Sequence, residues 1–225
     1  KFVRICRVKC ARPRNHQSLM LEDISEGGAD TYTMIHCGAK YVFRVNELRN
    51  SIMSCIANTD EFFPEPRQVN NPYNNLPLSN CALYNFYFFL KTRNYGIPAL
   101  LHGFFLSAFD EKKFVLDYEI LIRDKAIEEY VLHESVVVLY SLVFRMLVHH
   151  NRIHGLTSNS IQIAKGFPVK KLVEAMRPYL RLFLFTLYYV HDLPKQHTYA
   201  DDLWEKLAKF SSVCPNFGER IETAD

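Results

Sequence analysis

The chain has 225 residues, of which 48% are hydrophobic and 23% are charged, as in an ordinary globular protein. Its formal net charge of +3 is too small to indicate that the whole surface binds nucleic acid. Only 8 glycines occur, which argues against an enzyme with glycine-rich phosphate loops, whereas 17 phenylalanines and 13 tyrosines are a surplus of the kind that protein interfaces contain.

Residues 1–45 have the pattern of β structure. We expect short strands at residues 1–10 and 19–24, separated from the next element by a glycine-containing turn. A β-hairpin is expected over residues 31–45, with its turn at Cys37-Gly38-Ala39. This part of the chain is therefore predicted to be a small β-rich unit.

Basic residues crowd the start of the chain, and the first acidic residue is Glu22. A cationic arm of this kind can bind phosphates or an acidic protein surface. Basic side chains also protect an exposed strand edge from pairing with other chains, and this alternative needs no ligand. The arm consists of Lys1, Arg4, Arg7, Lys9, Arg12 and Arg14.

Helical patterns dominate after the hairpin. A first helix is expected over residues 46–58, followed by a proline- and asparagine-rich loop over residues 62–78. Further helices are expected over residues 79–90, 98–108 and 111–132, the last of them bent. Apolar residues surround the helix at 79–90 on nearly all sides, so it should be buried or lie in an interface.

The most apolar helix is expected over residues 134–150. Its polar positions Ser141, Arg145 and His149 form one narrow stripe, which predicts a central place in a helical bundle. Arg145 has two interpretations, because a buried arginine needs an acidic partner whereas one at the edge of the helix can keep its head in solvent.

A long helix is expected from Pro168 to about residue 191, with a kink at Pro178. Its first half carries a basic stripe at Lys170, Lys171, Arg177 and Arg181. The last helix is expected to begin with Thr198 as its N-cap and to contain the ion pairs Asp202–Lys206 and Glu205–Lys209.

Motifs of common enzyme classes do not occur in the sequence, so we predict a non-enzymatic protein without catalytic residues, cofactor or metal. Two metal hypotheses remain open. Cys6, Cys10, His36 and Cys37 form one possible ligand set, although the usual paired spacing is missing. His149, His150 and His154 form another, although cationic residues also favour a helix C-terminus without metal.

The cysteines show no paired spacing, and those within helical patterns resemble small buried hydrophobic residues. This pattern is typical of free thiols in a reducing compartment. No apolar run is long enough for a membrane span. The sequence opens without a methionine or a signal peptide, so we expect the natural N-terminus to lie elsewhere.

Two helices, at residues 79–90 and 182–190, lack a polar face, and a domain of this size cannot bury every such helix. We therefore predict that part of this surface binds a protein partner, mainly through residues 182–190, because aromatic side chains are enriched at interface cores. The predicted partner-binding residues are Phe183, Tyr188, Tyr189, Tyr84 and Phe88.

Three segments carry a resemblance to a known group of proteins. They are Lys40-Tyr-Val-Phe-Arg-Val-Asn-Glu-Leu48, Asn71-Pro-Tyr-Asn-Asn-Leu-Pro-Leu-Ser79 and Leu83-Tyr-Asn-Phe-Tyr87. Together they resemble a pattern in uncharacterised proteins of nucleocytoplasmic large DNA viruses, and they are similar to the U-box core, which packs a hairpin, a helix and a loop without metal. The similarity covers residues 41–90, with Asn74 in place of the usual Thr and Leu78 in place of Phe.

This resemblance implies a viral origin and a location in the virion or in the virus factory of the host cytoplasm. It implies a structural role as a minor capsid protein among other subunits of a large assembly, such as the major capsid protein. Two other functions stay open, namely a nucleic-acid-binding accessory protein that uses the basic arm and a U-box-like ubiquitin adaptor.

The predicted fold class is α+β and mostly α. A small β-hairpin and helix unit, residues 1–78, is expected to pack on a helical bundle formed by residues 79–225.

Overall fold

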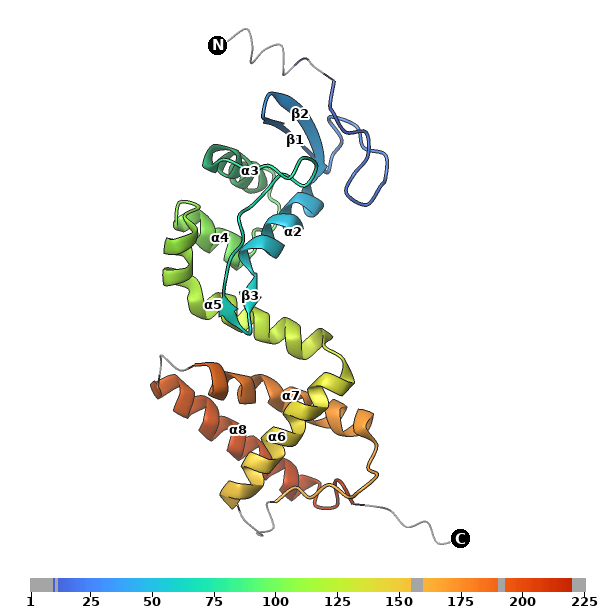
Figure 1. Ribbon diagram of the computed structural model, residues 1–225, viewed down its shortest axis with the longest axis vertical. Coiled ribbons are helices and arrows are strands. Elements are labelled where there is room, and N and C mark those ends of the chain that lie inside the picture. Colours follow the sequence, from blue (N-terminus) through green and yellow to red (C-terminus); the bar gives the residue numbers. More distant parts are fainter. Residues whose placement is uncertain (1–9, 11, 155–159, 190–192, 220–225) are drawn as a thin grey trace. The chain divides into compact units, whose positions relative to one another are not determined.

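The computed structural model describes residues 10, 12–154, 160–189 and 193–219. The chain divides into two compact units, Lys1–Arg123 and Asp124–Asp225, which are described separately. The described residues contain 7 helices and two small two-stranded sheets, which confirms the mostly helical α+β class (Figure 1). The division between the units falls within one helix rather than after residue 78, where the sequence placed it.

The elements of the first unit follow the predicted order. They are β1 (Thr31–His36), β2 (Ala39–Arg44), α2 (Val45–Ile56), β3 (Thr59–Asp60), β4 (Phe63–Pro64), α3 (Asn80–Thr92), α4 (Ala99–Leu106) and the first part of α5 (Glu111–His133). The helices α3 and α4 belong to this unit because they share a hydrophobic core with the hairpin; for example, the rings of Tyr32 and Phe86 lie 5.0 Å apart.

The predicted hairpin is confirmed. Strands β1 and β2 pair antiparallel, with Thr31 opposite Arg44 and His36 opposite Ala39. Cys37 and Gly38 form the two-residue turn, with φ of 49° and 78°. Positive φ at both positions belongs to the turn type that matches the twist of a hairpin, and glycine adopts it without steric cost.

Residues 14–30 form a loop on the hairpin. The prediction of a strand at residues 19–24 is wrong, because this stretch forms a turn closed by an isolated bridge between Gln17 and Asp23. Asn15 holds the loop to β2 through two hydrogen bonds to the backbone of Val42, of 2.7 and 2.9 Å. The predicted strand at residues 1–10 lies almost wholly outside the described residues.

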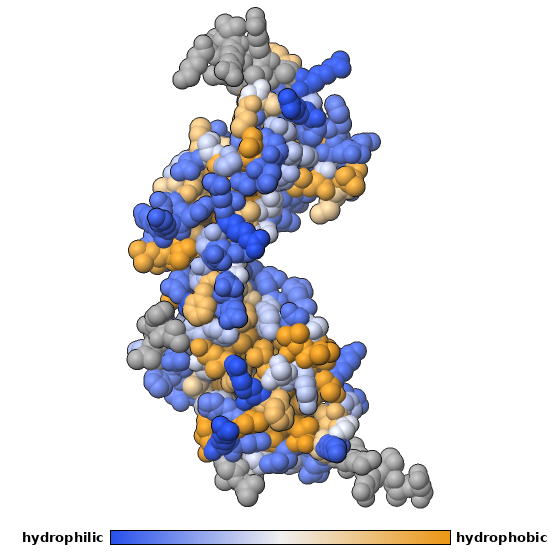
Figure 2. All heavy atoms as spheres, in the orientation of Figure 1, coloured by the Kyte–Doolittle hydropathy of each residue, from blue (hydrophilic) through white to orange (hydrophobic). Residues whose placement is uncertain are grey.

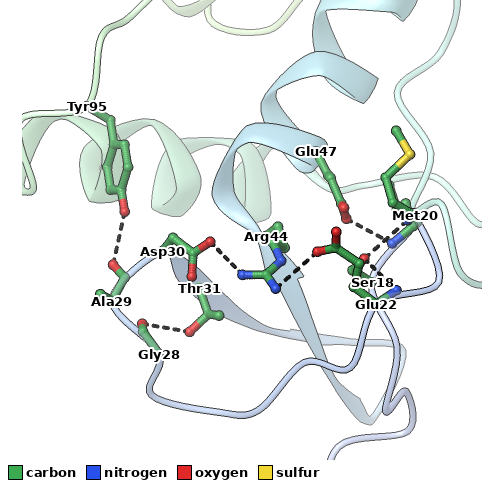
Figure 3. A network of polar contacts seen from close by, with 11 residues as sticks. Ser18, Met20, Glu22, Gly28, Ala29, Asp30, Thr31, Arg44, Glu47 and Tyr95 are labelled. Carbon is green, nitrogen blue, oxygen red and sulfur yellow. Dashed lines mark hydrogen bonds and ion pairs between the residues drawn. The ribbon is translucent and has the colours of Figure 1, made fainter.

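Ion pairs and hydrogen bonds fix this loop against α2 and β2 (Figure 3). The guanidinium group of Arg44 binds Asp30 at 2.7 Å and Glu22 at 3.2 Å, which lie on opposite sides of it. Glu47 accepts a hydrogen bond of 2.8 Å from the backbone N–H of Leu19. The loop is therefore held by acidic groups from its middle, from its last residue and from α2.

Helix α5 lies very close to α4 where the two cross. A Cβ atom added to Gly103 would lie 2.9 Å from the ring of Tyr118, so only glycine fits there without displacement of that ring. The backbone of α5 leaves helical geometry at Tyr118, with φ of −127° and ψ of 16°. The sequence divided this helix into residues 111–123 and 125–132, so a bend is present as expected but lies earlier, at Tyr118 beside the contact.

The second unit is formed by the end of α5 together with α6 (Val136–His154), α7 (Val169–Tyr188) and α8 (Leu193–Val213). Helix α7 packs against both α6 and α8. The hydrophobic core of the second unit includes Leu139, Val143, Met146, Leu147, Leu172, Val173, Met176, Leu180, Phe183, Leu184, Phe185, Leu203 and Leu207. Figure 1 shows α6 crossing in front of α7 and α8.

Helix α8 begins at Leu193, so Thr198 lies within the helix and is not its N-cap. The hydroxyl of Thr198 instead donates to the carbonyl oxygen of Pro194, one turn earlier, at 2.9 Å. The predicted ion pair between Asp202 and Lys206 is present at 2.7 Å.

After α8 the chain returns to the segment that precedes α7. The backbone N–H of Ala164 donates to the carbonyl oxygen of Gly218 at 2.8 Å. Gly218 has a φ of +92°, and a Cβ atom there would lie 2.3 Å from the carbonyl oxygen of Gln162. The rings of Phe167 and Phe217 lie 5.4 Å apart beside this contact. Only a glycine permits so close an approach of the two backbones.

Among the described helices, none is by itself long and apolar enough to cross a membrane; α5 and α6 pass that test of length and composition only as a bent pair.

Candidate functional site

The loop with the Asn-Pro-Tyr motif packs on the end of the hairpin through His36. The Nε2 atom of His36 lies 3.0 Å from the carbonyl oxygen of Pro77, which can only accept, so Nε2 carries the proton. The Nδ1 atom then accepts hydrogen bonds from the side-chain amides of Asn71 at 3.1 Å and Asn74 at 3.3 Å. The motif residues therefore have a structural role in this loop.

The geometry at His36 also bears on the first metal hypothesis. Both ring nitrogens of His36 bind protein groups, and Cys37 and Cys10 are exposed, while Cys6 lies outside the described residues. No group of three or more His, Cys, Asp or Glu side chains in the described part of the chain is placed to hold a metal ion.

The second histidine group packs on an aromatic ring. The ring of His149 stacks on Trp204 at 5.0 Å, and the fully buried ring of His150 lies 5.9 Å from the same indole. These contacts join α6 to α8. The side chain of His154 lies outside the described residues.

The predicted partner-binding residues of α7 are mostly core residues, which corrects the sequence-based choice of residues 182–190. Phe183 and Tyr189 are 1% and 2% exposed, and Tyr188 is half-buried. Tyr189 packs on Tyr199 of α8 at 5.3 Å and donates a hydrogen bond to Asp124. Burial, followed by this carboxylate, raises the pKa of Tyr189. Helix α8 covers the face that was expected to be open.

The basic stripe on α7 is partly occupied within its own unit. Arg177 donates hydrogen bonds to the carbonyl oxygens of Val131 and Leu132 at the end of α5. Arg181 forms an ion pair of 2.7 Å with Glu128. Two of the four cations of the stripe therefore stabilise the contact between α5 and α7. In the basic arm, Arg12 and Arg14 are exposed, whereas Lys1, Arg4, Arg7 and Lys9 lie outside the described residues.

The two predicted partner-binding residues of α3 do lie together. Tyr84 and Phe88 stack at 6.5 Å, and both contact Phe105 of α4, at 5.8 and 5.7 Å. Phe88 is 48% exposed and Leu106 beside it is 54% exposed. The α3–α4 surface therefore offers a small aromatic patch, with Tyr84 only partly accessible.

The largest departure from expectation is α6, which was predicted to be central and has an open apolar face. Val137 is 80% exposed, Phe144 is 56% exposed and Tyr140 is 37% exposed. We call Val137, Tyr140, Phe144 and the half-buried Val148 the α6 stripe. Positions spaced by three or four residues lie on the same face of a helix, so these side chains form one continuous strip. The rings of Tyr140 and Phe144 are 6.5 Å apart.

The opposite face of α6 supplies Leu139, Val143, Met146 and Leu147 to the core of the unit. A helix that is apolar on nearly all sides is normally covered on all sides. In α6 the side chains beside the α6 stripe, Ser141, Arg145 and His149, are exposed. The narrow polar stripe of the sequence thus marks the solvent side of the helix, and the apolar residues flanking it were the signal that sequence reasoning missed.

The structure agrees with the second interpretation of Arg145, in which the residue lies at the edge of the helix and keeps its charged head in solvent. Its side chain is exposed, and its guanidinium carbon lies 5.6 Å from the centre of the Phe183 ring. The charged head lies over the core aromatic in a cation–π contact and stays accessible to solvent.

Figure 2 shows extensive hydrophobic surface on the unit that contains α6. Leu132, at 65% exposure, and Val138, at 41%, extend the apolar surface at the N-terminal end of α6. Exposed apolar patches of this kind on a folded unit mark sites of interaction with another protein. The α6 stripe is therefore the strongest candidate functional site among the described residues.

No protein-family model matches the chain, and neither a curated protein nor a solved structure matches it significantly.

Proposed function

We propose that this chain is a non-enzymatic assembly protein that binds other protein subunits through the α6 stripe. The observation that carries the proposal is the combination of Val137 at 80% and Phe144 at 56% exposure on a helix whose other face is fully buried. Burial of such side chains against a partner would gain about 25 cal/mol for each Å² of apolar area removed from water. An interface would therefore recover free energy that the isolated unit leaves unused.

The resemblance to proteins of large DNA viruses supports a more specific form of this proposal. In that form the chain is a minor capsid protein, the partners are other virion subunits such as the major capsid protein, and the protein lies in the virion or the virus factory. An aromatic-rich chain with an open apolar helix suits a subunit that is stable only within its assembly.

The experiment is sedimentation of the natural assembly. In cells that produce this protein, the wild-type chain should sediment with a large complex, and the substitution Phe144→Glu should release it into the light fractions. Leu116→Glu, at an apolar residue of the other unit that is 82% exposed, is the matched control and should leave the chain in the complex. A wild-type chain found only in the light fractions would contradict an assembly role.

A nucleic-acid-binding accessory protein is the second candidate, favoured by the exposure of Arg12 and Arg14 beside the other cations of the basic arm. A U-box-like ubiquitin adaptor is the third, and it rests on the resemblance alone. If the purified chain transferred ubiquitin in the presence of conjugating enzymes, this result would favour the adaptor function over the assembly proposal.

A further inference from the structure

The α6 stripe has the spacing of a helix-pairing seam. Val137, Tyr140, Phe144 and Val148 follow one another at intervals of three, four and four residues, the pattern by which one helix packs along another. At about 1.5 Å of rise per residue, the stripe is roughly 16 Å long. A partner that fits it is another helix with an apolar strip of similar length.

Charges of opposite sign lie near the two ends of this seam. Glu134 precedes the N-terminus of α6, and the exposed Arg152 lies near the C-terminal end of the helix. Glu134 lies two residues before the helix, and its carboxylate accepts a hydrogen bond of 2.8 Å from the backbone N–H of Ser135, which keeps the negative charge at this end of α6. The helix dipole adds a partial positive charge at the N-terminal end, near Glu134, and a partial negative charge at the C-terminal end, near Arg152.

These charges make the stripe complementary to itself in one orientation. When two copies of α6 run antiparallel, Tyr140 of each lies opposite Phe144 of the other, and Val137 lies opposite Val148. The acidic end of each copy, which contains Glu134, then lies beside the basic end of the other, which contains Arg152. A parallel pair would instead place like charges together at both ends.

We infer that the α6 stripe pairs antiparallel with the α6 stripe of a second copy of this chain. Charge complementarity selects this occupant, because two Glu134–Arg152 pairs form at once and the exposed Arg145 falls beside the neutral Val138 and Ser141 of the other copy. A twofold axis perpendicular to the helices relates the two copies, as in most homodimers. The inference rests on the proposed function, for which the dimer is the first step of assembly.

The first test is the association state of the purified full chain, measured by sedimentation velocity over a range of concentrations. The wild-type chain should form dimers, and Val137→Ser with Phe144→Ser should raise the dimer dissociation constant at least tenfold. Both side chains are exposed, so the circular dichroism spectrum and melting temperature of the variant should match those of the wild type at concentrations where both are monomers. Leu116→Ser, at an apolar residue of the first unit that is 82% exposed, is the matched control and should dimerise like the wild type.

The second test exchanges the charges. Glu134→Arg alone and Arg152→Glu alone should each weaken dimerisation, because each puts like charges at both contacts. An equimolar mixture of the two variants should form heterodimers, in which every contact again joins opposite charges. The double variant carrying both changes should dimerise as the wild type does. A parallel pair already joins like charges at both ends, so neither single change would weaken it. Weakening by each single change together with recovery in the mixture therefore identifies antiparallel pairing and would not follow from a loss of folding.

A wild-type chain that stays monomeric at its highest soluble concentration would overturn the inference, as would a dimer that ignores the α6 substitutions or a mixture that shows no rescue. These outcomes are separate from the sedimentation experiment on the natural assembly. A monomer that still enters a large complex refutes only the dimer, whereas a dimer that enters no complex refutes only the assembly role.

Discussion

The side-chain amide of Asn71 donates a hydrogen bond of 3.1 Å to Nδ1 of His36, across 35 positions of the sequence. Both side chains are buried, with exposures of 0% and 7%. The Oδ1 atom of Asn71 also accepts from the backbone N–H of Tyr73 at 3.0 Å. One asparagine thus closes its own loop and attaches that loop to the tip of the hairpin.

Asn71→Ala should lower the free energy of unfolding of the first unit by about 1–3 kcal/mol, because two hydrogen bonds are lost and each contributes about 0.5–1.5 kcal/mol. The substitution removes the acceptor of the part-buried backbone N–H of Tyr73 and the closer of the two amides that donate to Nδ1 of His36. Denaturant unfolding followed by circular dichroism measures the change. Gln68→Ala, at an exposed position of the same loop, is the control. Equal stability of the two variants would show that the hydrogen bonds at His36 contribute nothing net.

Gly103→Ala should destabilise the crossing of α4 and α5 by about 1–3 kcal/mol, the usual cost of overpacking a core. The added methyl group would lie 2.9 Å from the Tyr118 ring, so that ring must move. Alanine favours a helix more than glycine does, and helix propensity alone therefore predicts the opposite sign. Thermal unfolding of the variant decides between the two effects. Gly103→Ala combined with Tyr118→Ala should be less destabilised than the sum of the single changes, because the clash is then absent.

Alkaline pH should destabilise the first unit through Tyr32. Burial, with the charge of Cys81 as a second cause, raises the pKa of Tyr32 to about 12, whereas an exposed tyrosine titrates near 10. The stabilising contribution of neutral Tyr32 is therefore complete below about pH 10 and is lost as the pH rises from there to about 12. Unfolding free energies measured at several pH values should fall less steeply for Tyr32→Phe than for the wild type. Equal slopes would place the alkaline sensitivity in other tyrosines.

The basic arm should give salt-dependent binding to random duplex DNA if the second candidate function is correct. With all six cations on phosphates, the logarithm of the binding constant should fall against the logarithm of the salt concentration with a slope of about −5. Arg12→Gln with Arg14→Gln should make that slope less steep by about 2. Fluorescence anisotropy at several salt concentrations measures it, and absent binding at low salt would remove this function.

The elements that were predicted correctly are encoded by local patterns, each of which spans only a few residues. The hairpin follows from a glycine turn between two apolar runs. Helix α3 begins beside residue 79, where it was expected to start, and the hydroxyl of Ser79 accepts from the backbone N–H of Ala82 at 3.3 Å. The strand expected at residues 19–24 failed because Glu47 and Asn15 hold that segment as a loop, and no local pattern reports such distant contacts.

The candidate site was harder to predict because apolar composition shows that a helix must be covered and does not show by what. Helix α7 has no polar face in its second half, yet α6 and α8 bury it from two sides. Helix α6 has one covered face and one open face, although its sequence is just as apolar. Which of these two helices keeps an open surface is decided by the packing order of α6, α7 and α8, and that order is a property of the tertiary structure.

The backbone contact at Gly218 affects the order in which the protein can be completed during translation. The first unit has its own core and can fold while later residues are still being added, since domains generally fold as they emerge. Ala164, by contrast, finds its hydrogen-bond acceptor in Gly218, which is synthesised after the whole of α7 and α8. The segment before α7 therefore cannot form this hydrogen bond until α7 and α8 have left the ribosome. A nascent chain halted at the end of α8 would expose that segment to proteases, even though α6, α7 and α8 were complete.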